Sequence, residues 1–73
     1  MDRKMLLQRL AMAERHVAEG WEHLRRQREL ISEQERDGRD TSLARDLLVT
    51  MEKSQEQHCA ARDRIAEKLA RLS

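Results

Sequence analysis

Two runs of mostly apolar residues, spaced alternately four and three positions apart, dominate this chain. The first run contains Leu6, Leu10, Ala13, Val17, Gly20, Leu24, Gln27, Ile31 and Gln34, and the second contains Ala44, Leu48, Met51, Gln55, His58, Arg62, Ile65, Leu69 and Leu72. This spacing places each run on one stripe of an α-helix, and such a stripe must be covered by a neighbouring element. The sequence therefore predicts an all-α fold with two long helices.

The break between the two runs is short and has the residues of a turn. Gly38 can adopt the left-handed conformation that ends a helix, and Asp40 or Thr41 can cap the next helix with a side-chain oxygen. We expect a first helix over residues 3–37, a loop over 38–40 and a second helix over 41–72. Because so short a connection permits only antiparallel helices, residues 1–73 should form a single helical-hairpin domain.

Closing the hairpin around residue 39 brings the two runs into register along their whole length. In this register Ile31 faces Leu48, and Leu24 faces Gln55. Gly20 then faces His58. A glycine inside a helix costs about 1 kcal/mol relative to alanine, so a packing gain should offset it. We expect Gly20 to provide steric room for His58.

A hairpin of this size should not be stable as a monomer. At 73 residues a single core is marginal, and further apolar residues, such as Leu7, Trp21, Leu30, Leu47 and Ala61, widen each stripe beyond a two-helix contact. We therefore expect a homodimer that forms an antiparallel four-helix bundle. The predicted interface residues are Gly20, Trp21, Leu24, Gln27, Met51, Gln55, His58 and Arg62. Charged residues make up 40% of the chain, which also suits a disordered protein, but the unbroken heptads argue against disorder.

Three histidines, His16, His23 and His58, belong to the polar middle of the predicted bundle. One interpretation is a polar layer that fixes register and oligomeric state. Another is a metal site, because imidazoles on facing helices bind transition metals. A third is a pH-sensitive contact, because histidine titrates near neutrality. The first interpretation is favoured, because the Glu-x-x-His pattern of di-iron bundles is absent and His16 lies about 10.5 Å from His23 along one helix.

Composition argues against several other functional classes. The 15 Lys and Arg nearly balance 14 Asp and Glu, so we expect the arginines to lie in a salt-bridged face and not to bind nucleic acid. The lone Cys59 and the lack of a signal or spanning segment predict a cytoplasmic protein that does not enter a membrane. Trp21 is either a core anchor or a contact for an unidentified protein partner. No residues suggest an enzyme or a cofactor site.

Several short motifs resemble those of a family of short uncharacterised proteins from proteobacteria. They are HVAEG at 16–20, His23, RQRELI at 26–31, ERDG at 35–38, Asp40-Thr41, Glu52-x-Ser54-Gln55-x-x-His58 and RDR at 62–64. The resemblance covers roughly residues 10–65 and implies a bacterial cytoplasmic protein with no assigned activity. It also implies that His16, Gly20, His23, Gln27 and His58 belong to the family pattern.

The hypothesis that follows is a non-enzymatic, homodimeric interaction or regulatory module. The alternatives are a metal-binding or metal-sensing bundle that uses His16, His23 and His58, and an adaptor that docks a partner helix through Trp21.

Overall fold

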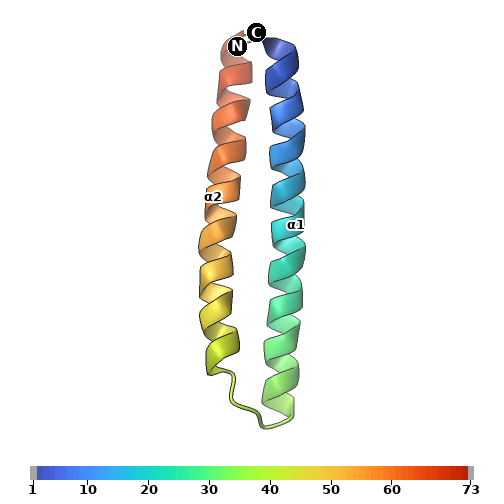
Figure 1. Ribbon diagram of the computed structural model, residues 1–73, viewed down its shortest axis with the longest axis vertical. Coiled ribbons are helices and arrows are strands. Elements are labelled where there is room, and N and C mark those ends of the chain that lie inside the picture. Colours follow the sequence, from blue (N-terminus) through green and yellow to red (C-terminus); the bar gives the residue numbers. More distant parts are fainter. Residues whose placement is uncertain (1, 73) are drawn as a thin grey trace.

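The computed structural model describes residues 2–72 as two long antiparallel helices joined by a short loop (Figure 1). Helix α1 spans Arg3–Arg36 and helix α2 spans Ser42–Leu72. The hairpin is 55 Å long and only 14 by 13 Å across. Residues 2–72 contain no strand, so the predicted all-α class and the helical hairpin are confirmed. Helix α1 ends at Arg36, where residue 37 was expected, and α2 begins at Ser42, where residue 41 was expected.

Capping interactions explain where α1 begins and ends. At its start, the Asp2 carboxylate accepts a hydrogen bond of 2.7 Å from the Met5 backbone N–H. At its end, the Arg39 N–H donates to the Gln34 carbonyl and the Gly38 N–H donates to the Glu35 carbonyl, which is the Schellman pattern. Gly38 has a φ of 71°, so the predicted left-handed helix terminus is confirmed.

The start of α2 is fixed by the short polar segment before it. The Asp40 carboxylate accepts hydrogen bonds from both the backbone N–H and the hydroxyl of Ser42. These bonds favour the charged form, so they lower the pKa of Asp40 below its ordinary value, with the Ser42 hydroxyl as the largest cause. The Thr41 carbonyl accepts the first helical bond of α2, from the Arg45 N–H. Asp40 and Thr41 are the two predicted caps of this helix, and Asp40 is the one whose side chain accepts a hydrogen bond from a backbone N–H.

Replacing Gly38 tests the turn. Gly38→Ala should destabilise the fold by about 1 kcal/mol, because alanine resists a positive φ, whereas no neighbouring atom would touch the added methyl group. Gly38→Asn is the matched control and should cost less, because asparagine tolerates this conformation. Urea denaturation of the three proteins at one concentration measures both effects. An alanine variant as stable as the wild type would contradict the predicted strain.

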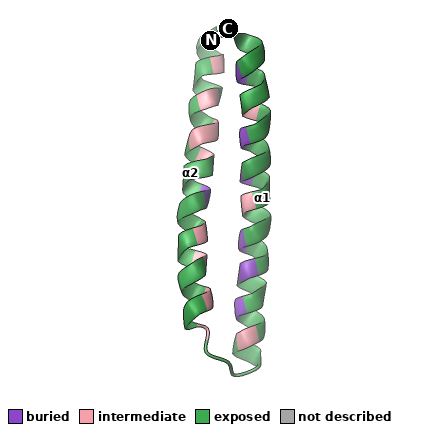
Figure 2. Ribbon diagram, in the orientation of Figure 1, coloured by how far each residue is buried: buried purple, intermediate pink, exposed green. Residues whose placement is uncertain are grey.

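The contact between the helices is a single narrow stripe (Figure 2). The buried apolar side chains all lie on α1 and are Leu6, Ala13, Val17, Leu24 and Ile31. The facing residues of α2 are mostly half-buried, and they are Ala44, Leu48, Met51, Cys59, Ala61, Arg62, Ile65 and Leu69. Two helices leave the outer half of each stripe uncovered, so the hairpin by itself has a small core.

Two residues assigned to the α2 stripe from the heptad spacing, His58 and Leu72, are exposed. Cys59 and Ala61 are half-buried in the region where His58 was expected to pack. Because an α-helix has about 3.6 residues per turn and a strict heptad requires about 3.5, a step of four residues can replace a step of three. The contact passes from Gln55 to Cys59 by such a step and then returns to the heptad positions Arg62, Ile65 and Leu69.

Candidate functional site

The middle of the hairpin is organised around Gln55, the only buried residue of α2 in the part of the chain that the structure describes. Its side-chain amide is 4% exposed and donates a 2.8 Å hydrogen bond from Nε2 to the Val17 carbonyl of α1. A Cβ added at Gly20 would lie 1.6 Å from Gln55 Oε1. Gly20 therefore makes space for Gln55, and the expectation that it makes space for His58 is wrong.

A second glutamine makes the same kind of contact nearer the loop. Gln27, buried on α1, donates a 2.9 Å hydrogen bond from Nε2 to the Ala44 carbonyl of α2. A carbonyl oxygen has two lone pairs, so it can accept this bond in addition to its helical bond. Because each amide bonds one particular carbonyl, a slide of one helix along the other would leave buried donors unpaired. The two glutamines thus favour one register.

The histidines lie on one side of this layer. The rings of His16 and His58, from different helices, have centroids 5.8 Å apart and planes tilted by 53°. With His23, Glu19 and Gly20 they line a shallow depression of about 200 Å³. All three imidazoles are on exposed residues. Within residues 2–72, no group of three or more His, Cys, Asp or Glu side chains could hold a metal ion.

Trp21 lies on the other side of the layer, because two helical positions from His23 correspond to a rotation of about 200°. Its side chain is 54% exposed and forms the α1 wall of a groove of about 480 Å³ between the helices. We call this the Trp21 groove, and its lining residues are Trp21, Leu24, Arg28, Glu52, Gln55, Glu56, Cys59, Ala60 and Asp63. Trp21 is therefore not part of the core within one hairpin.

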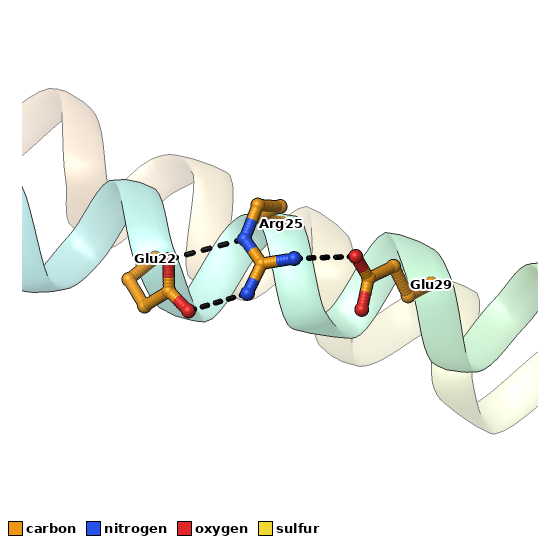
Figure 3. Close-up of polar contacts among 3 residues, drawn as sticks. All are labelled: Glu22, Arg25 and Glu29. Carbon is orange, nitrogen blue, oxygen red and sulfur yellow. Dashed lines mark hydrogen bonds and ion pairs between the residues drawn. The ribbon is translucent and has the colours of Figure 1, made fainter.

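Three arginines in the half of the hairpin nearer the loop, Arg25, Arg28 and Arg45, form ion pairs. Arg25 bonds Glu22, with the closest N–O distance 2.6 Å, and also pairs with Glu29 (Figure 3). The bond to Arg25 lowers the pKa of the Glu22 carboxyl, and the same bond raises the pKa of Arg25. Between the helices, Arg28 pairs with Glu52 at 3.4 Å and Arg45 pairs with Glu35. For these three arginines the predicted salt bridges are present, and because the pairs are exposed they stabilise the fold only slightly.

The other predicted interface residues occupy intermediate positions. Met51 is half-buried and lines a depression beside His23 and Gln55. Arg62 is half-buried and donates from Nε to the Asp63 carboxylate at 3.0 Å, which raises the pKa of the Arg62 guanidinium. Leu24 is 2% exposed and belongs to the contact within the hairpin.

Comparison with known proteins adds no identity to these features. The chain matches no family model, no curated protein and no solved structure. The resemblance to short proteobacterial proteins therefore stays a prediction. Neither α1 nor α2, over the residues described, contains a stretch long and apolar enough to cross a membrane.

Proposed function

We propose that this chain is a non-enzymatic, homodimeric interaction module in which two hairpins pack face to face as an antiparallel four-helix bundle. The observation that carries the proposal is the size of the core. Large apolar side chains remain exposed outside the contact stripe, namely Met5, Leu7, Met12, Trp21, Leu30, Leu43, Leu47, Val49 and Leu72. Exposed apolar surface of this extent beside a marginal core is typical of an interface.

The middle of the hairpin supports a structural role for its polar residues. The buried amides of Gln27 and Gln55 are used to bind the opposite helix, and Gly20 is used to admit Gln55. In a bundle, a polar layer of this kind selects one alignment of helices at some cost in stability. A regulatory module needs such a defined surface, because a partner must recognise one arrangement. We further propose a reducing cytoplasm as the setting, since Cys59 is a free thiol.

Light scattering coupled to size-exclusion chromatography tests the proposal. At micromolar concentration we expect a mass twice that of the 8.7 kDa chain, and a melting temperature that rises with protein concentration. Both results follow because a second hairpin docked on one flank covers apolar side chains that the monomer leaves exposed. A compact 8.7 kDa species with a cooperative, concentration-independent melt would refute the proposed function.

A further inference from the structure

The two walls of the Trp21 groove differ in side-chain size, which suits the groove to pack against a second copy of itself. Its α1 wall carries a large exposed indole, whereas its α2 wall carries the small side chains of Cys59 and Ala60. A large side chain on one wall and small side chains on the other permit two copies to interdigitate. A tryptophan in such a position is also the residue type most enriched at the centres of protein interfaces.

We infer that the second copy docks on the Trp21 groove, with each Trp21 seated over Cys59 and Ala60 of the other copy and with both loops at the same end. This inference rests on the proposed dimer and adds its face and its orientation. Trp21, Cys59 and Ala60 line one groove, and because Gly20 faces position 58 in the register of the hairpin, the three residues lie within about three helical positions of one level. A two-fold axis parallel to the helices sets α1 of one copy over α2 of the other at equal levels, and these helices run antiparallel, as a four-helix bundle requires.

The charges around the groove complement each other in this orientation. The α1 wall carries Arg28, and the α2 wall carries Glu52, Glu56 and Asp63. Within residues 2–72, Arg28 forms one ion pair, with Glu52. Among the described residues Glu56 has no ion partner. Setting α1 over α2 of the second copy brings each Arg28 near the Glu52 and Glu56 carboxylates opposite. Opposite loop ends would instead bring the two carboxylate-bearing walls of α2 together, which is unfavourable.

The same face continues as an apolar surface toward the end opposite the loop. Leu7 precedes Trp21 by two heptads and therefore lies on the same flank of α1, where its side chain is 48% exposed. On α2, Ala66 follows Cys59 by one heptad, and both Ala66 and Ala70 are exposed. In the proposed dimer Leu7 packs at the level of these alanines. The interface thus repeats the pairing of a large residue on α1 with small residues on α2.

Two matched variants distinguish the Trp21 groove from the opposite side of the hairpin, where Leu30 and His23 line one depression. Trp21→Glu should weaken dimerisation by about 30-fold or more, because it places a charge at the centre of the interface. Leu30 lies on the opposite flank of α1 and is 42% exposed, so Leu30→Glu should leave the dimer intact. Sedimentation equilibrium of both variants measures the dissociation constants. A dimeric Trp21→Glu protein would overturn the inference, and so would a monomeric Leu30→Glu protein.

The fluorescence of the wild-type protein gives a second test that needs no variant. Trp21 is the only tryptophan, and the second copy should bury its exposed indole. Its emission should therefore shift to longer wavelength as the dimer is diluted to monomer. A dimer established by light scattering whose emission matches that of exposed tryptophan at every concentration would overturn the inference and leave the proposed function standing. A monomeric wild type would instead refute the proposed function.

The orientation is measured by a distance between spin labels at the loops. The double variant Arg39→Cys, Cys59→Ser carries one label per chain. With both loops at the same end, the labels should be separated by a few helix spacings of about 10 Å each. With loops at opposite ends, they should be separated by about the 55 Å length of the hairpin. A single distance near that length would overturn the proposed orientation.

Discussion

Leu24→Ala should abolish the cooperative thermal transition of this protein or lower its midpoint drastically. Leu24 is 2% exposed and lies at the centre of the narrow contact between the helices. Replacing a buried leucine by alanine costs about 2–5 kcal/mol, because burial is lost and a cavity remains. A single core in a chain this small rarely supplies more than about 3–5 kcal/mol, so the loss is comparable with the total stability.

Circular dichroism melts at one protein concentration measure this effect. Met12→Ala is the matched control, because Met12 is a large apolar residue of the same helix whose side chain is 59% exposed. It should change the free energy of unfolding by no more than about 0.5 kcal/mol. A Leu24→Ala protein that melts within a few degrees of the Met12→Ala protein would show that the contact within the hairpin is not the main source of stability.

Gly20→Ala should destabilise the wild type but stabilise a protein that lacks the Gln55 side chain. In the wild type the new methyl group would collide with Gln55 Oε1 and displace the amide from the Val17 carbonyl. An unpaired buried donor costs about 1–3 kcal/mol, which equals or exceeds the gain of about 1 kcal/mol from replacing a helical glycine. In the Gln55→Ala background only the gain remains.

The four proteins of this double-mutant cycle isolate the coupling between the two positions. Urea denaturation of the wild type, both single variants and the double variant should give a coupling energy of about 1–3 kcal/mol. The sign of the Gly20→Ala effect should reverse between the two backgrounds. Equal stabilisation by Gly20→Ala in both would mean that the amide has room to move at no cost, and that Gly20 is not there to admit Gln55.

The sequence was sufficient to predict the helices and the turn, because their signals are local. Gly38 provides the left-handed terminus, and Asp40 provides a cap within two residues of the bond it accepts. Heptad spacing likewise identified the α1 stripe, where Leu6, Val17 and Ile31 are buried. These features depend on neighbours in sequence or on helical periodicity, so they are readable without coordinates.

The partner of Gly20 could not be predicted from facing positions alone. Heptad arithmetic pairs backbone levels, whereas the long side chain of Gln55 bonds the Val17 carbonyl and fills the space that a Cβ at Gly20 would need. The assignment of His58 to the stripe is wrong for a related reason, since Cys59, one position further along α2, is half-buried in its place. A buried glutamine in a stripe near a glycine is the signal that could have suggested the correct pairing.

The antiparallel geometry places the beginning of α1 beside the end of α2, about one helix diameter apart and opposite the Gly38 turn (Figure 1). A linker of a few residues is therefore long enough to join these ends, and the chain can be reopened in the polar segment between Arg36 and Ser42. Such a circularly permuted chain would keep both helices and their contact stripe while reversing their order along the polypeptide.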